Sequence, residues 1–183
     1  MSLNLIINLW LYSGFLNATG EYLNVWLVGS SIIKQAFIDA RISPGRVHLG
    51  LERVGMRLWW QARSGLTLDR LRNLVGIIWR CTYIHIDSSG GGNDIRRICL
   101  RDLRKKYKDE IDWVEKKLPN CIIIFLPILS RINWRYAKNV GSMEKWRLWF
   151  NNAVASYVLR NGGCYVRYPD VKAKSAHLED GCN

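Results

Sequence analysis

The sequence predicts a three-layer α/β/α sandwich built on a doubly wound, mainly parallel sheet of five strands. Short apolar segments alternate with amphipathic segments along the chain, which is typical of strands alternating with helices. The apolar segments are nearly continuous, as in parallel strands that are buried on both faces. The length of 183 residues suits one domain with a real core. Right-handed crossovers between parallel strands would place helices on both faces.

Each predicted strand is a short run rich in β-branched or aromatic residues. The five runs are 22–28 (YLNVWLV), 56–62 (MRLWWQA), 82–86 (TYIHI), 121–126 (CIIIFL) and 164–168 (CYVRY). The first three runs are followed by small-residue turns, which contain Gly29-Ser30-Ser31, Ser64-Gly65 and the Gly90–Asp94 loop of the glycine-rich run 87–94 (DSSGGGND). Ligands of such sheets bind at the carboxyl ends of the strands, so these turns mark the edge where a site is expected.

The predicted helices have apolar residues at helical spacing between polar ones. They cover 31–41, a segment that opens at Thr67, 95–118 and 142–160. Ser31 and Ser142 are expected to cap the first and the last of them. Pro119 and Gly162 mark two helix ends.

The two termini differ from the predicted domain in composition or in pattern. Residues 1–20 are expected to be an apolar extension, and residues 21–183 one domain. The extension lacks the basic region and the cleavage site of a signal peptide, and it is too short and interrupted to span a bilayer. Five scattered cysteines without a C-x-x-C pair predict buried free thiols in a reducing compartment. We therefore expect an intracellular protein of the cytoplasm or nucleus, with secretion as the alternative.

Neither a metal site nor a cofactor is predicted, because the chain has no His/Cys/Asp cluster at ligand spacing and no P-loop. The formal net charge of +12 favours anionic partners. Basic residues crowd the predicted helix 95–118, which is either a solvated face or a surface for phosphate groups. The residues concerned are Arg96, Arg97, Arg101, Arg104, Lys105, Lys106 and Lys108. One candidate function is thus a non-catalytic module that binds nucleic acid nonspecifically.

Four residues could carry chemistry at the sheet edge, and each has a simpler structural interpretation. Ser31 follows a strand and opens a helix, so it is a nucleophile or a helix cap. Gly65 offers an N–H to an oxyanion or only permits a turn, and Asn93 offers a side-chain amide or is an ordinary loop residue. His177 is a general base or an exposed histidine.

The order of these residues resembles the SGNH (GDSL-like) hydrolase family, and especially the esterase-like domains abundant in vertebrate genomes. The phrases that carry the resemblance are VWLVGSS, RLWWQARSGLTLDRL, IHI…GGND, NNAVASYVLRNGG and RYPDVKAKSAHL. The resemblance implies a flavodoxin-like fold and the hydrolysis of small acyl or acetyl esters. It also implies that Ser31 is the nucleophile, that Gly65 and Asn93 are oxyanion donors, and that His177 is the base.

The sequence departs from the family pattern near its end. Lys174 stands three residues before His177, where the family has Asp, and the alternative register at Asp180 ends in Asn183 instead of His. The chain also ends at Asn183, where relatives continue into a closing helix. These departures imply a truncated copy with weakened or no hydrolase activity, in which residues 3–16 could cover exposed apolar sheet surface.

Overall fold

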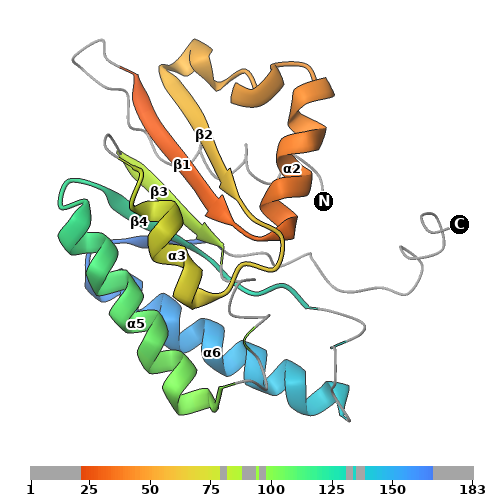
Figure 1. Cartoon of the computed structure of the whole chain (residues 1–183), viewed down its shortest axis with the longest axis vertical. Coiled ribbons are helices and arrows are strands. Elements are labelled where there is room, and N and C mark those ends of the chain that lie inside the picture. The colour runs from red at the N-terminus through yellow and green to blue at the C-terminus, as the bar shows by residue number, and fades with distance from the viewer. Residues whose placement is uncertain are drawn as a thin grey trace, which may run out of the picture.

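The computed structural model describes residues 22–78, 82–87, 94, 98–130, 134 and 139–166. Strands and α-helices alternate along the described chain, with two short 3-10 helices after the first pair (Figure 1). The elements are β1 (Leu23–Gly29), α2 (Ser31–Ile42), η1 (Arg46–His48), η2 (Leu51–Val54), β2 (Met56–Ala62), α3 (Leu68–Val75), β3 (Tyr83–Asp87), α5 (Leu100–Lys117), β4 (Ile122–Leu126), α6 (Val140–Arg160) and β5 (Cys164–Tyr165).

The five strands form one parallel sheet in the order β2-β1-β3-β4-β5, which confirms the predicted fold class. Val25 of β1 is in register with Leu58 of β2 on one side and with Tyr83 of β3 on the other. The chain therefore passes from β1 to β2 on one side of β1, and β3 then pairs with the other side of β1. This reversal at β1 and β3 is the topological switch point where doubly wound sheets bind ligands.

Successive residues of β1 belong to two separate cores. Trp26 and Val28 pack with α3, α5 and α6, whereas Val25 and Leu27 pack with α2 on the opposite face. Figure 1 shows the same division, with α2 on one side of the strands and the other α-helices on the other. Burial on both faces explains why the strand sequences are continuously apolar.

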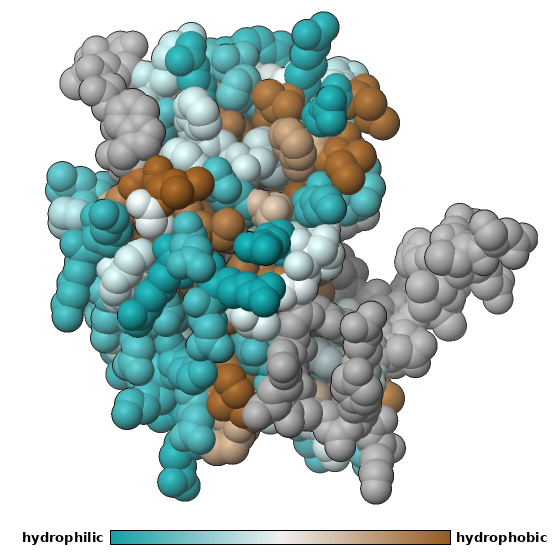
Figure 2. Space-filling view, viewed as in Figure 1, coloured by the Kyte–Doolittle hydropathy of each residue, from teal (hydrophilic) through white to brown (hydrophobic). Residues whose placement is uncertain are grey.

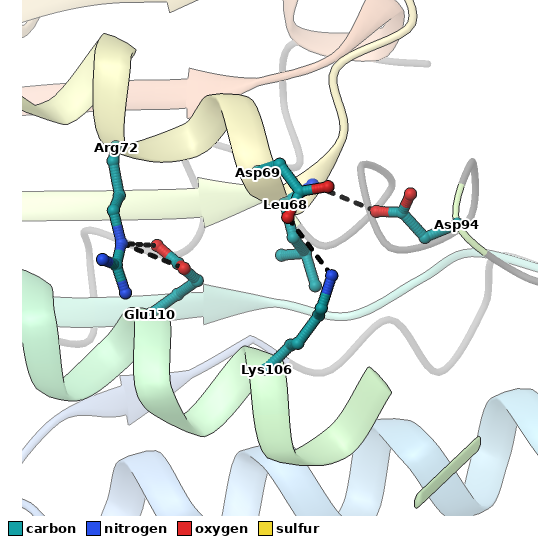
Figure 3. Close-up of polar contacts among 6 residues, drawn as sticks. All are labelled: Leu68, Asp69, Arg72, Asp94, Lys106 and Glu110. Atoms are coloured by element: carbon teal, nitrogen blue, oxygen red, sulfur yellow. Dashed lines mark hydrogen bonds and ion pairs between the residues drawn. The ribbon is translucent and has the colours of Figure 1, made fainter. Parts of the chain in front are cut away.

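Aromatic packing and ion pairs join the helices of the larger core. The Tyr107 ring of α5 meets the rings of Phe125 and Phe150 edge-on, with centroids 5.9 and 5.4 Å apart. The Arg72 Nε of α3 lies 3.0 Å from the Glu110 carboxylate of α5 (Figure 3). These contacts fix α3, and with it the turn that precedes α3, against the sheet.

Two helix starts differ from the prediction. Asn139 caps α6, because its Oδ1 accepts the Ser142 N–H at 3.0 Å, so the expected Ser142 cap is wrong. Both residues have capping side chains, and sequence pattern alone does not choose between them. The helix predicted from residue 95 begins at Leu100, and residues 95–97 lie outside the described part of the chain.

The sequence pattern did not indicate the two 3-10 helices, which lie beside the edge strand β2. Nδ1 of His48 accepts the Leu58 N–H at 3.1 Å, and the carbonyl of Val47 accepts Nε1 of Trp60 at 2.8 Å. Such coverage shields an edge strand that would otherwise offer unpaired backbone groups to other chains.

The cysteines only partly follow the prediction of buried free thiols. Cys121 is disulfide-bonded. Cys99 and Cys164 are free but exposed, because Cys99 precedes the first residue of α5 at the surface and Cys164 lies on an edge strand. Cys81 and Cys182 lie outside the described residues. No described helix is long and apolar enough to cross a membrane.

Candidate active site

The turns after β1 and β2 lie side by side at the carboxyl edge of the sheet. Gly29 and Ala62 are register partners at the ends of their strands, and the Arg63 N–H donates to the Gly29 carbonyl at 3.0 Å. Ser31 and Gly65 each stand two residues beyond this hydrogen-bonded pair. The parallel pairing of β1 and β2 therefore brings two of the four predicted site residues to one place.

Ser31 is the first residue of α2 and not its cap. The cap position belongs to the buried Ser30, so the capping interpretation of Ser31 is wrong. Ser31 is exposed, and neither its hydroxyl nor its N–H is hydrogen-bonded to another described residue. The N-terminus of α2 carries a positive partial charge, which favours a negative oxygen at this position. The Ser31 hydroxyl is thus accessible to an attacking role.

Gly65 has a positive φ of +66°, a conformation that favours glycine, so the turn by itself accounts for a glycine at this position. The turn is closed by the Leu66 N–H, which donates to the Arg63 carbonyl at 3.1 Å. Gly65 itself is exposed, and its N–H has no acceptor among the described residues. A Cβ added at Gly65 would meet no atom within 4 Å, so the space beside it is open. The turn and the oxyanion interpretations are therefore compatible.

Asp94 ties the end of the glycine-rich loop to the segment after Gly65. Its buried carboxylate accepts the N–H of Leu68, the first residue of α3, at 3.0 Å (Figure 3). Thr67, at the cap position of α3, makes no side-chain capping bond. Asp94 thus caps α3 from a distant part of the chain. Sequence reasoning missed this role, because the local capping signal of an Asp concerns the helix that directly follows it, and Leu68 is 26 residues away.

Asn93 and His177 lie outside the described residues, as do Lys174 and Asp180. Asn93 is nevertheless the immediate neighbour of Asp94, and consecutive Cα atoms are about 3.8 Å apart. The described chain thus brings together the turns of Ser31 and Gly65 and anchors the residue that follows Asn93.

A buried polar pair holds the segment after β4, at the same edge of the sheet. Asn151 of α6 accepts the Ile128 N–H at 3.0 Å and donates to the Ile128 carbonyl at 2.9 Å. Arg147 also donates to that carbonyl, at 3.0 Å. The signal in the sequence is an Asn among apolar face residues of a helix, because a buried amide needs partners.

A pocket of about 420 Å³ lies at the opposite edge, near the amino end of β4. Its lining includes Glu115, whose pKa is raised mainly by burial and further by the negative charge of Asp112. The pocket is remote from Ser31, so it belongs to a different part of the molecule. The described residues contain no group of three or more His, Cys, Asp or Glu that could hold a metal ion.

The basic side chains of α5 do not form one free surface. Lys106 pairs with Asp69 at 3.2 Å (Figure 3), and Arg104 and Lys108 lie over the rings of Trp149 and Tyr157. Acidic residues share the helix: Asp102, Asp109, Glu110, Asp112 and Glu115. Arg101 and Lys105 are exposed, and Arg96 and Arg97 lie outside the described residues. Figure 2 shows hydrophilic side chains of the α5 side as a broad surface.

Known structures with the same architecture are lipases and esterases. A protein from Parabacteroides merdae, assigned as a GDSL-like lipase, matches with a TM-score of 0.62 at 13% identity, covering 80% of this chain and 78% of its own. A mutant of the esterase AlinE4 matches with a TM-score of 0.60 at 16% identity, covering 86% of both chains. Esterase EstA from Pseudoalteromonas sp. matches with a TM-score of 0.56 at 14% identity, covering 86% of this chain and 84% of its own.

The chain therefore has an SGNH-like hydrolase fold. At these identities the likeness concerns the fold alone. No protein-family model and no curated protein matches the sequence.

Proposed function

We propose that this chain is a weakened serine ester hydrolase that acts on small acyl or acetyl esters, with Ser31 as its nucleophile. The observation that carries the proposal is the position of Ser31. An exposed hydroxyl without a partner among the described residues stands at a helix N-terminus, at the switch point of the sheet. The fold shared with esterases and lipases supports the same chemistry.

In the proposed reaction, His177 removes the proton as the Ser31 oxygen attacks the ester carbonyl carbon. The carbonyl π electrons move to oxygen, and that oxyanion is bound by the N–H groups of Ser31 and Gly65 and by the Asn93 amide. Collapse breaks the bond to the alkoxy group, which leaves as an alcohol with the proton from His177. Water then releases the acid by the same steps and regenerates the Ser31 hydroxyl.

Lys174 is the reason to expect slow turnover. In serine proteases, replacing the carboxylate that orients the histidine by an amide lowers kcat about 10⁴-fold. A lysine three residues before His177 supplies neither the hydrogen-bond acceptor nor the negative charge that stabilises the imidazolium. The oxyanion donors and the nucleophile remain, and such groups alone retain part of the catalysis.

The test compares Ser31→Ala with the wild type in p-nitrophenyl acetate hydrolysis and in labelling by a fluorophosphonate. Ser142→Ala is the matched control, because Ser142 is also an exposed serine in the first turn of a helix. We expect Ser31→Ala to lose both signals and Ser142→Ala to keep them. Equal rates in wild type and Ser31→Ala would eliminate serine catalysis. Lys174→Asp should raise the rate by up to about 10⁴-fold if the missing carboxylate limits turnover.

A nonspecific nucleic-acid module is the alternative proposal, supported by the net charge of +12. The ion pair with Asp69 offsets the charge of Lys106, and ring contacts hold Arg104 and Lys108 against α6, so fewer cations of α5 are free to meet phosphates, which counts against it. Binding through phosphates would weaken steeply as salt rises. An affinity that does not change between low and moderate salt would contradict this alternative.

A further inference from the structure

Half of one sheet face has no described α-helix over it. On the first face, α6 packs against β4 and β5, and α3 and α5 complete the layer. On the second face, α2 packs against β1 and β2, and it is the only described α-helix that contributes to that core. Strands of a parallel sheet are normally covered on both faces. The second face of β4 and β5 is therefore the place where a covering element is required.

The side chains near the start and middle of β4 on this half of the face are apolar and incompletely buried, whereas Leu126 at the end of β4 and Val166 after β5 are buried on the same face. Ile122 and Ile124 of β4 are half-buried and pack at the border of the α2 core. Cys164 of β5 is in register with Ile124 and is exposed. In contrast, Ile123 and Phe125, which point to the opposite face, are buried. We call Ile122, Ile124 and Cys164 the open stripe.

Two terminal segments lie outside the described residues, and only one has the composition to cover an apolar stripe. Residues 3–16 (LNLIINLWLYSGFL) contain ten apolar side chains and no charged one. Residues 167–183 contain six charged side chains among seventeen. Burial of unpaired charge is costly, so the C-terminal segment is unsuited to this surface.

The length and starting point of the N-terminal segment fit the open stripe. The described chain begins at Tyr22, directly before β1, and β5 is three strand positions from β1. Three strand spacings amount to about 14 Å, a distance that residues 17–21 span at about 3.3 Å per residue. As a helix, 14 residues would extend about 21 Å, and a five-residue strand such as β4 is about 17 Å long.

The pattern of the segment also suits a helix that docks through one side. Leu5, Leu9, Tyr12 and Leu16 recur at helical spacing, whereas Asn4 and Asn8 fall on another stripe. We propose that residues 3–16 of this chain dock on the open stripe and complete the second helical layer of the sandwich. In this proposal the segment covers β4 and β5 on the second face, as α6 covers them on the first.

Cys164 reports on this docking in the full-length chain. The rate of maleimide addition is measured at each cysteine by mass spectrometry, in native protein and in denaturant, so that each thiol serves as its own reference. Cys99, exposed at the start of α5, is the internal control. We expect native Cys164 to react at least about tenfold more slowly than in denaturant, and more strongly protected than Cys99.

A full-length variant with Leu5→Ser, Leu9→Ser and Tyr12→Ser should raise Cys164 labelling about tenfold without changing Cys99. The matched control, Asn4→Ser with Asn8→Ser, should leave both rates unchanged. Unprotected Cys164 in the wild type would overturn the proposal, and so would protection that persists in the triple variant. Protection that grows with protein concentration would assign the surface to a second copy. If the triple variant does not fold, amide exchange of residues 3–16 in the wild type decides, because docking requires slowed exchange.

Discussion

Replacing Asp94 by alanine would test whether one buried carboxylate holds two turns of the candidate site together. The Asp94 side chain is 3% exposed, and it accepts the Leu68 N–H at 3.0 Å. A hydrogen bond to a charged group contributes about 1.5–3 kcal/mol, and a negative charge at a helix N-terminus adds roughly 0.3–1 kcal/mol. We expect Asp94→Ala to lower the free energy of unfolding by about 2–3 kcal/mol, and the Tm by roughly 5–10 °C for a chain of this size.

The measurement is thermal and urea unfolding followed by circular dichroism, together with the ester hydrolysis rate. Asp69→Ala is the control. Asp69 lies in the first turn of α3, the helix that Asp94 caps, but it is exposed and pairs with Lys106 at the surface. Such surface pairs contribute about 0–1 kcal/mol. Equal losses of stability in the two variants would refute the reasoning. If Asp94 also positions its neighbour Asn93, the hydrolysis rate of folded Asp94→Ala should fall while that of Asp69→Ala should not.

Two further predictions concern the opposite edge of the sheet. Because burial and the charge of Asp112 raise the pKa of Glu115 above 4.5, its contribution to stability is present below pH 4.5 and is lost as the pH rises through the folded-state pKa. Glu115→Gln should therefore gain Tm relative to wild type at pH 7 but not at pH 4, and an equal difference at both pH values would contradict this. Gly163→Ala should lower Tm strongly, because its Cβ would lie 2.6 Å from the Ile123 carbonyl oxygen. Gly162→Ala should lower the free energy of unfolding by only about 1–2 kcal/mol, through its φ of +79° alone. Similar unfolding curves for the two variants would contradict this prediction.

The strands were the most predictable elements, since each is marked by its own residues. The strand at 56–62 was predicted at its observed bounds, and the first helix was predicted within one residue of its end. Helix starts were less certain where two capping residues stood close together, as at Asn139 and Ser142. The 3-10 helices beside β2 have no periodic apolar pattern, so the local sequence did not predict them.

Two of the four predicted site residues, Ser31 and Gly65, lie in the part of the chain that the structure describes. The turns at Ser31 and Gly65 follow from small residues after apolar runs, and the structure describes both. The capping role of Asp94 could not be predicted, because its partner Leu68 is 26 residues away. Asn151 is similar, since an amide on an apolar helix face predicts a hydrogen-bond partner but not that the partner is the Ile128 backbone. Asn93 and His177 remain predictions.

The sequence by itself determined which segments are strands and helices and where the chain turns, because apolar period and turn residues act between near neighbours. Only the tertiary structure decided that the β1 and β2 turns adjoin, that Asp94 caps α3 from afar, and that Cys121 is bonded to another cysteine. It also decided that α2 covers only one half of its sheet face. These features depend on which distant segments pair, and that choice is made by the summed burial and hydrogen bonding of the whole fold.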